Sequence, residues 1–227
     1  MCGRYTIIKS PEELEKEFEI DINKEVFETT YNLAPSQNGL VITNQHKNEG
    51  QFFKWGLIPF WAKDEKIGYK MINARSETLT EKSAFKTPLQ KRRCVVIADG
   101  FYEWKKIGKE KHPSYIYLAN KKPFAMAGLW ETWSSPAKET IHSFTIITTK
   151  ANEFMSTLHD RMPVIFDNNS DINLWLDNEL SANEHLQLLQ QLPSDKMAMH
   201  QVSQMVNSPK NNQPLLITPL ENLGTLF

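Results

Sequence analysis

The chain has 227 residues, of which 40% are hydrophobic, and its 26 Lys and Arg residues nearly balance its 27 Asp and Glu residues. This size suits one large core, and the formal net charge of −1 excludes a protein that coats duplex DNA through its overall charge, so any nucleic-acid surface must be local. The sequence contains no apolar run of ~18 residues, so we expect no membrane span. It has no secretion signal, and Cys2 and Cys94 form no recognisable metal or disulfide framework. We therefore expect one intracellular domain over residues 1–227, without metal or cofactor.

The first predicted element is a helix over Pro11–Phe18. Ser10 is a typical N-cap residue, and Glu13, three positions later, completes a capping box. Proline suits the first turn of a helix, where no backbone donor is needed. Leu14 and Phe18 are four residues apart and are expected to face the core.

Seven short apolar or alternating runs predict strands. They are Leu40–Thr43, Gln51–Trp55, Cys94–Ala98, Phe101–Trp104, Ser114–Leu118, Phe124–Leu129 and Ser143–Thr148. Turn-forming residues at Asp99-Gly100, at Ile107-Gly108-Lys109 and at 120–123 separate several of these runs, and hairpin connections are expected there. The pattern indicates a meandering antiparallel sheet or barrel.

Helical spacing returns in the second half of the chain, in Ala151–Leu158, Asp171–Leu176 and Ala182–Leu192. Met197–Val202 has the pattern of a returning strand, and Asn207–Pro214 is typical of a loop within the domain. We therefore expect an α+β fold, a single domain with a mainly antiparallel β-sheet or barrel core and flanking helices.

Cys2 is the first residue with distinctive chemistry. Removal of Met1, which a small side chain at position 2 permits, would leave an α-amine beside a thiol. The α-amine has a reference pKa near 7.7–8.0, against about 10.4 for lysine, so about a tenth of it is neutral at pH 7 and can form a Schiff base with an aldehyde. The thiol can then close on the imine carbon to give a thiazolidine. The alternative is that Cys2 is incidental.

Two further segments combine polar residues with apolar or aromatic neighbours. Asn73-Ala74-Arg75-Ser76-Glu77-Thr78 could bind a phosphate through Arg75; as structure alone, Asn73 would cap the next turn and Arg75 would pair with a surface carboxylate. In Gly100–Trp104 the carboxylate of Glu103 stands among aromatic residues, where burial disfavours its charged form and suits it to move protons. Alternatively, Glu103 points to solvent from the polar face of a strand.

The segment His159–Pro163 follows a predicted helix, at a junction where functional side chains are often displayed. His159 could shuttle a proton, or it could be an ordinary surface or core histidine. Only five of the 26 basic residues are arginine, and three of them, Arg4, Arg75 and Arg161, stand beside Cys2, Asn73 and His159. Because the arginine fork suits phosphate, they indicate an anionic ligand such as a nucleic-acid backbone.

Two residues are candidates for contacts with bases. Trp61, in the aromatic segment Trp55–Trp61, and Pro35, in Tyr31–Pro35, could stack on bases or wedge a duplex open. As structure alone, both would belong to the core.

Six segments, in this order along the chain, resemble the SOS-response-associated peptidase (SRAP) family. They are Cys2-Gly3-Arg4-Tyr5, Tyr31–Pro35, Trp55-Gly56, Asn73–Thr78, Gly100–Trp104 and His159–Pro163. Residues 202–207 look like the closing segment of the family, so the resemblance covers essentially the whole domain.

The resemblance implies a protein that captures abasic sites in single-stranded DNA, and at its junctions with duplex DNA, through a thiazolidine with the ring-opened sugar. It implies that Cys2 is the nucleophile and that Asn73 positions the terminus and the sugar. Glu103 would move protons during imine formation and reversal. His159 would promote opening of the sugar ring.

By the same resemblance, arginines would hold the DNA backbone, namely Arg4, Arg75 and Arg161. Pro35 and Trp61 would contact the flanking bases. We expect a monomer that acts inside the cell and associates with the nucleoid when DNA is damaged.

Other activities remain open at this stage. The family name records an autoproteolytic peptidase, in which Cys2 would attack a peptide bond with the terminal amine as base. Since only Met1 precedes Cys2, general methionine removal would suffice for maturation. A lyase side reaction is chemically reasonable, because a Schiff base permits β-elimination of the 3′ phosphate. A module that binds modified DNA without forming a bond is the third alternative.

Overall fold

Two β-sheets organise residues 2–223, the part of the chain that the computed structural model describes. The strands of the larger sheet are β2 (Asp21–Ile22), β4 (Asn38–Thr43), β5 (Glu49–Trp55), β6 (Asn73–Arg75), β7 (Arg93–Ala98), β10 (Phe124–Ser134), β11 (Thr140–Lys150), β12 (Arg161–Pro163) and β13 (Ile165–Phe166). They lie in the order β12-β11-β10-β7-β4-β5-β2, with β13 beside β10 and β6 beside β11.

The larger sheet closes on itself as a barrel. Strand β11 pairs with β10 and also, in parallel, with β5, where Phe144 lies opposite Trp55. The path β5-β4-β7-β10-β11 therefore returns to its start, and these strands have no open edge there. Aromatic rings fill the core: Tyr5 packs edge-on against Trp55 with ring centroids 5.1 Å apart, and Trp55 stacks on Phe144 at 6.3 Å.

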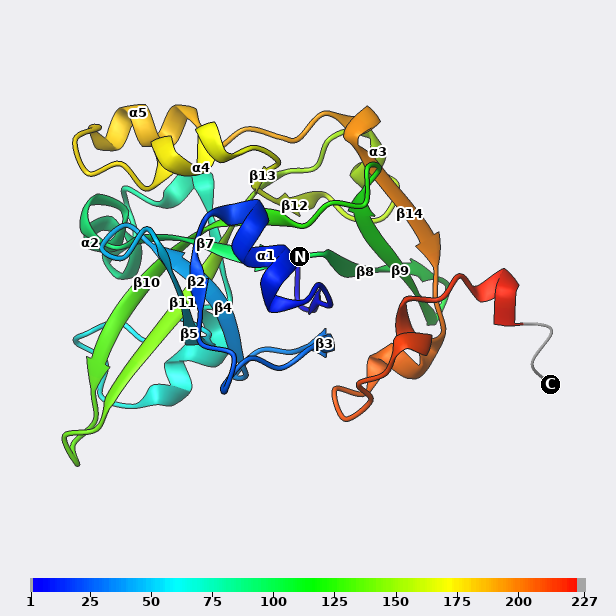
Figure 1. The fold of residues 1–227 in the computed structure, drawn as a ribbon, viewed down its shortest axis with the longest axis horizontal. Coiled ribbons are helices and arrows are strands. Elements are labelled where there is room, and N and C mark those ends of the chain that lie inside the picture. Colours follow the sequence, from blue (N-terminus) through cyan, green and yellow to red (C-terminus); the bar gives the residue numbers. More distant parts are fainter. Residues whose placement is uncertain (1, 224–227) are drawn as a thin grey trace.

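The smaller sheet is antiparallel throughout. Its strands are β1 (Tyr5–Ile7), β3 (Thr30–Leu33), β8 (Gly100–Ile107), β9 (Glu110–Leu118) and β14 (Met197–Gln201), in the order β14-β9-β8-β1-β3. In Figure 1, β8, β9 and β14 lie to the right of the barrel strands, and the C-terminal turns lie beside them. The hairpin between β8 and β9, predicted at Ile107-Gly108-Lys109, is confirmed; Gly108 has a φ of 61°, which favours glycine.

The two other predicted hairpin turns are wrong. At Asp99-Gly100 the chain passes from β7 of the barrel to β8 of the smaller sheet, and at 120–123 it passes back from β9 to β10. The carboxylate of Asp99 accepts hydrogen bonds from the backbone amides of Ile8 and Lys9, which tie the crossing to the end of β1. A turn signal marks where a strand ends, but it does not say which sheet the next strand joins.

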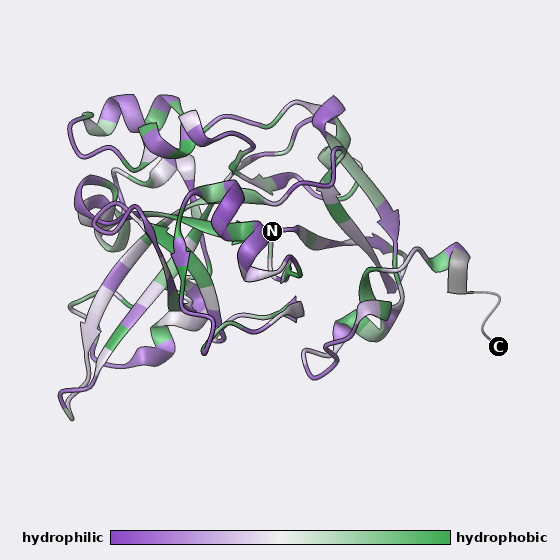
Figure 2. Ribbon diagram, in the orientation of Figure 1, coloured by the Kyte–Doolittle hydropathy of each residue, from purple (hydrophilic) through white to green (hydrophobic). Residues whose placement is uncertain are grey.

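The helices flank the sheets. They are α1 (Pro11–Phe18), α2 (Ser83–Lys91), α3 (Glu153–Ser156), α4 (Asn169–Trp175) and α5 (Ala182–Gln187), with 3-10 turns η1 (Glu65–Lys70), η2 (Ser76–Thr78), η3 (Ser194–Lys196), η4 (Gln204–Asn207), η5 (Pro214–Ile217) and η6 (Leu220–Leu223). Figure 2 shows mostly hydrophilic residues on α1 and α2, and hydrophobic residues where the barrel strands cross the middle of the molecule. Within residues 2–223, no helix has the length and apolar character needed to cross a membrane.

Most predicted elements are confirmed, with shifted ends. All seven predicted strand runs lie inside longer strands, and α1 has the predicted capping box between Ser10 and Glu13. The predicted helix Ala151–Leu158 spans only α3, and Ala182–Leu192 stops at Gln187, beyond which the backbone makes tight turns. The sequence did not predict α2, because Pro88 inside it removes a backbone donor. The α+β fold with a mainly antiparallel barrel core is confirmed.

Candidate functional site

Strand pairing brings Glu103 beside the start of the chain. Strands β1 and β8 run side by side, and the amide of Tyr102 donates to the carbonyl oxygen of Arg4 at 2.9 Å. Glu103 is the next residue along β8, its side chain is 3% exposed, and its charge acts on the thiol of Cys2. The alternative that Glu103 points to solvent is therefore wrong.

Asn73 contacts Cys2 from the barrel. It is the first residue of β6, and its Nδ2 donates to the carbonyl oxygen of Cys2 at 2.8 Å. Pairing of Asn73 with Ile146 of β11 fixes its place. No side chain caps η2, which begins after Arg75, so the capping role that structure alone would give Asn73 is absent there.

The environment of Cys2 suppresses its thiolate. Burial raises the pKa of the Cys2 thiol to about 12, and the neighbouring charge of Glu103 contributes in the same direction, while a hydrogen bond from the backbone of Arg4 opposes them. A thiol with this pKa has a thiolate fraction on the order of 10⁻⁵ at pH 7. Cysteines that act as free thiolates have lowered pKa values. A buried thiol of this kind is not a ready nucleophile by itself, and Glu103 is the carboxylate whose charge acts on it.

Strand β11 joins two distant polar segments. Arg75 of β6 lies opposite Thr148, and β12 pairs with Thr148–Lys150 of β11. From β12, Arg161 donates to both carboxylate oxygens of Glu77, at 2.6 and 2.9 Å, and to the carbonyl oxygen of Thr148 at 2.6 Å. Arg161 is 7% exposed, whereas Arg75 is exposed. A phosphate would have to compete with Glu77 for the guanidinium of Arg161 but not for that of Arg75.

Arg4 is held by a segment near the C-terminus. Its Nη1 donates to Oδ1 of Asn32 at 2.6 Å and to the carbonyl oxygen of Val206 at 2.9 Å, and its guanidinium lies 5.9 Å from the ring centroid of Trp104. Asn32, in β3, is buried, and its Nδ2 donates to three carbonyl oxygens of residues 206–211 at 2.8–3.3 Å. We call residues 204–212 the C-terminal strap. The single amide of Asn32 thus connects the start of the chain to the strap.

His159 lies just after α3 and is partly exposed. Its Nδ1 accepts from the backbone amide of Arg161 at 3.0 Å and lies 2.7 Å from Oδ1 of Asp160. The two contacts need different protonation states: the neutral ring with its proton on Nε2 accepts from Arg161, and the protonated ring donates to Asp160. The proton-shuttle role of His159 stays a prediction.

The two residues expected to contact bases lie on exposed loops. Trp61, 47% exposed, stands beside the exposed Phe60 on the connection from β5 to β6, so the core alternative is wrong for Trp61. Pro35 is half-buried between β3 and β4. The Trp61 loop is anchored at Gly56, which has a φ of 119° and where an added Cβ would lie 2.6 Å from the carbonyl oxygen of Gly68.

Comparison with known proteins identifies the family. The model described as "SOS response associated peptidase (SRAP)" matches residues 1–209. The chain belongs to the SRAP family. The resemblance seen in six sequence segments is thereby confirmed.

Several relatives of this SRAP chain match it along most of its length. It is 48% identical over 223 residues to the abasic site processing protein YoqW of Bacillus subtilis (strain 168), a match that covers 96% of this chain and 99% of YoqW. It is 34% identical over 259 residues to the abasic site processing protein HMCES of Xenopus tropicalis, covering 94% of this chain and 77% of HMCES. The crystal structure of a protein from Bacteroides thetaiotaomicron is similar with a TM-score of 0.88 and 28% identity, covering 96% and 99%.

The structure of this SRAP chain also reveals two residues that sequence reasoning missed. Glu77 pairs with Arg161, and Asn32 holds Arg4. Both stand inside the segments that carry the family resemblance, yet their contacts span 84 and 28 residues of sequence and no local pattern indicates them. Within residues 2–223, no group of three His, Cys, Asp or Glu side chains is arranged to hold a metal ion.

Proposed function

We propose that this protein processes abasic sites in single-stranded DNA, and at junctions with duplex DNA, by attaching itself covalently to them through Cys2. Its relatives YoqW and HMCES are named abasic site processing proteins. The observation that carries the proposal is the environment of Cys2, whose carbonyl oxygen is held by Asn73 and whose thiol lies in the field of Glu103.

The reaction begins once Met1 has been removed. The α-amine of Cys2 adds to the C1′ aldehyde of the ring-opened deoxyribose, and loss of one water gives an imine. The thiol then adds across the C=N bond: sulfur bonds to C1′, the thiol proton passes to nitrogen, and the thiazolidine closes. The product contains both partners minus one water, and no oxidant or cofactor is consumed.

The high pKa of the thiol sets the order of the steps. Burial raises the pKa of the Cys2 thiol and favours its protonated form at neutral pH, whereas an α-amine has a reference pKa near 7.7–8.0. The amine therefore reacts first. As sulfur bonds to carbon, Glu103 accepts the thiol proton and returns it to nitrogen, and the intramolecular closure benefits from a high effective molarity. Closure competes with β-elimination of the 3′ phosphate from the imine, so a lyase product would be minor.

Other side chains position the DNA. Asn73 holds the terminus against the sugar, and His159 supplies the proton that opens the sugar ring. Exposed Arg75 makes the direct contact with a phosphate. Arg4 and Arg161 add positive charge near the DNA backbone without a direct phosphate contact, because Asn32 and Glu77 already hold their guanidinium groups. Pro35 and Trp61 contact the flanking bases. The protein acts as a monomer, and the attachment shields the site from cleavage.

A cysteine peptidase is the second candidate, because the family is named for that activity. Burial acts against it, since it raises the pKa of Cys2 while thiolate nucleophiles need a lowered one. Loss of precursor cleavage in a Cys2→Ala variant that carries an extended N-terminus would favour the peptidase. A non-covalent module for modified DNA would instead bind reversibly with salt and keep its binding when Cys2 is changed.

The deciding experiment mixes the purified protein with a single-stranded oligonucleotide that contains one abasic site, then denatures the mixture. We expect a heat-stable shifted band whose mass equals both partners minus one water. Cys2→Ala and a form that retains Met1 should each abolish the band. Cys94→Ala is the matched control, because Cys94 is buried in the core and should be dispensable. An adduct that forms equally well without Cys2 or with Met1 attached would overturn the proposal.

A further inference from the structure

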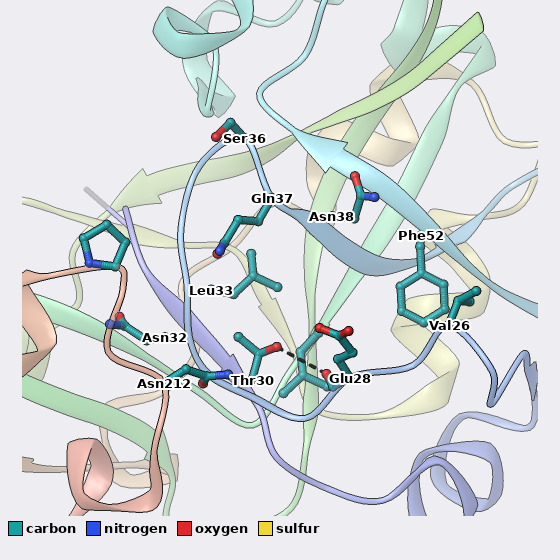
Figure 3. Close-up of a pocket in the computed structure, with 12 residues that line it drawn as sticks. Val26, Glu28, Thr30, Asn32, Leu33, Ser36, Gln37, Asn38, Phe52 and Asn212 are labelled. Carbon is teal, nitrogen blue, oxygen red and sulfur yellow. Dashed lines mark hydrogen bonds between the residues drawn. The ribbon is translucent and has the colours of Figure 1, made fainter.

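A pocket of about 500 Å³ opens beside the loop that carries Pro35. Its walls come from the end of β1, from β3, from the start of β4, from β5 and from the C-terminal strap. Figure 3 shows Leu33 at its centre, Phe52 and Val26 on one side, and Gln37 and Asn38 above. The pocket has the size of a small-ligand site, and its lining combines apolar side chains with a larger number of polar ones.

The lining has the chemistry of a nucleobase site and not of a phosphate site. Ile7, Leu33 and Phe52 form an apolar floor, while Gln37 and Asn38 contribute amides. Among residues 2–223, no lysine or arginine lines the pocket, and the carboxylate of Glu28 does, so a phosphate would be repelled. Amide side chains present a donor and an acceptor together, which complements the edges of bases. An unpaired base also has two apolar faces that an apolar floor and an aromatic ring can cover.

The loop that borders the pocket is strained. Ser36 follows Pro35 and has a φ of 75°, a left-handed conformation that costs on the order of 1 kcal/mol in a residue with a Cβ. Hydrogen bonds hold this loop at both ends. The amide of Ser36 donates to the carbonyl oxygen of Trp55 at 2.8 Å, and the amide of Trp55 donates to that of Gln37 at 2.9 Å. The amide of Gln37 donates to the carbonyl oxygen of Ala34 at 3.2 Å, and the amide of Ala34 donates to Oε1 of Gln37 at 2.7 Å. Strained backbone of this kind is common at ligand clamps.

The pocket continues the path proposed for the DNA strand. Pro35 was assigned to a flanking base, and Gln37 is only two residues beyond it, within about 7 Å along an extended chain. Because Oε1 of Gln37 is occupied by Ala34, its Nε2 is the atom through which it can donate to a ligand. A base that leaves the stack at Pro35 would lie close in sequence to this pocket, which the next two residues, Ser36 and Gln37, help to line.

We propose that this pocket binds one unpaired nucleobase that flanks the abasic site on the same strand. This proposal rests on the proposed function. The amide oxygen of Asn38 and the carboxylate of Glu28 can accept from an exocyclic amino group, while Nε2 of Gln37 can donate to a ring nitrogen, so the pocket favours adenine or cytosine. Thymine lacks that group and binds less well. The protein thereby gains a mild sequence preference at one flanking position.

The test uses abasic oligonucleotides in which each of the three positions on either side of the lesion is changed in turn to A, C, T or a base-free tetrahydrofuran spacer. Crosslinking is followed under single-turnover conditions over a range of protein concentrations. At one position, we expect T or the spacer to raise the protein concentration for half-maximal rate about fivefold, which corresponds to roughly one hydrogen bond. The maximal rate constant should stay the same.

Two variants assign the effect to the pocket. Asn38→Leu removes an exposed amide at the first residue of β4 and should abolish the preference. Gln45→Leu removes an exposed amide just beyond the other end of β4 and should keep it. Both variants are first checked for an unchanged thermal melting curve.

The outcomes separate this proposal from the one it rests on. Absence of any crosslink in the wild-type protein overturns the proposed function. Crosslinking that is normal but indifferent to every flanking base overturns the base-binding pocket alone. The pocket is also excluded when Asn38→Leu slows all oligonucleotides equally, since a structural defect would not distinguish between bases.

Discussion

The Nδ2 atom of Asn73 donates to the carbonyl oxygen of Cys2 at 2.8 Å, across a separation of 71 residues. This bond fixes the start of the chain against β6, whose own place is set by β11. In the proposed reaction the nitrogen and the sulfur both belong to Cys2, the residue whose backbone this bond holds. The barrel therefore holds the backbone of Cys2 in one position, through Asn73 of β6.

Asn73→Asp keeps the shape of the side chain but places an oxygen against the carbonyl oxygen of Cys2. We expect the crosslinking rate constant to fall on the order of 10²-fold, because small displacements of reacting atoms have effects of that size. The free energy of unfolding should fall by only about 1 kcal/mol, the value of one hydrogen bond. Single-turnover crosslinking and urea unfolding measure the two quantities. Asn48→Asp, at an exposed position, is the control. A rate equal to that of wild type would remove Asn73 from the site.

Local interactions explain which elements could be predicted from the sequence. Helix α1 was predictable because Ser10 and Glu13 cap each other within four residues. The strand runs were predictable from their apolar pattern. By contrast, the parallel pairing of β11 with β5, which closes the barrel, joins segments about ninety residues apart and leaves no sequence pattern. Helix α2 was missed because its apolar face includes Pro88, a residue that normally argues against a helix.

In the candidate site, too, some features could be predicted from the sequence and others could not. Cys2, Glu103 and His159 could be proposed from their chemistry, since a thiol, a carboxylate among aromatics and an imidazole are distinctive side chains. The burial of Glu103 could not be predicted, because the pattern of an alternating strand does not reveal which of its faces is buried. The contact of Arg161 with Glu77 could not be predicted from the sequence either. It forms because β12 and β6 both pair with β11, which brings Arg161 close to the segment after β6.

Arg75 and Arg161 should differ in how they affect DNA binding. Arg75→Gln is expected to reduce the slope of log K against log salt by about 0.7, the value for one phosphate of single-stranded DNA. Arg161→Gln should leave the slope unchanged and lower the free energy of unfolding by about 1.5–3 kcal/mol, because hydrogen bonds between charged groups are lost. Fluorescence anisotropy in a Cys2→Ala background gives the slopes without covalent attachment. An equal loss of slope in both variants would show that Arg161 also contacts a phosphate.

Asp99 should make the stability of the protein depend on pH. Burial raises the pKa of Asp99 from an ordinary value of 3.8 to about 6, although the amides of Ile8 and Lys9 oppose the shift. Because the folded-state pKa is the higher one, the contribution of Asp99 to stability is complete below pH 3.8 and is lost as the pH rises through 6. At about 1.4 kcal/mol per pKa unit, the loss is about 3 kcal/mol.

Asp99→Asn removes the charge that is costly to bury and keeps an oxygen that can accept from both amides. We expect the variant to exceed wild type in free energy of unfolding by up to about 3 kcal/mol above pH 7, with the difference closing towards pH 4. Urea unfolding of both proteins at half-unit steps of pH measures this difference directly. A difference that is constant over that range would mean that Asp99 does not titrate there.

Two substitutions at Asn32 can distinguish the effect of its contact with Arg4 from the effect of its contacts with the C-terminal strap. Asn32→Asp keeps the acceptor for Arg4 but loses the donor that reaches three carbonyl oxygens of the strap, whereas Asn32→Ala loses both. We expect amide hydrogen exchange of residues 204–212 to accelerate in both variants, because each leaves those carbonyl oxygens without the amide, at a cost of about 1–3 kcal/mol.

Crosslinking should distinguish the two variants of Asn32. In Asn32→Asp the guanidinium of Arg4 keeps its partner, and the charge on that partner strengthens the hydrogen bond. The backbone of Arg4 then continues to hold the thiol of Cys2, so the crosslinking rate should stay within about twofold of wild type, a change below 1 kcal/mol. In Asn32→Ala the guanidinium is released, and the rate should fall by about tenfold, or roughly 1.4 kcal/mol. Equal rates in the two variants would show that the strap, and not Arg4, transmits the effect of Asn32 to the terminus.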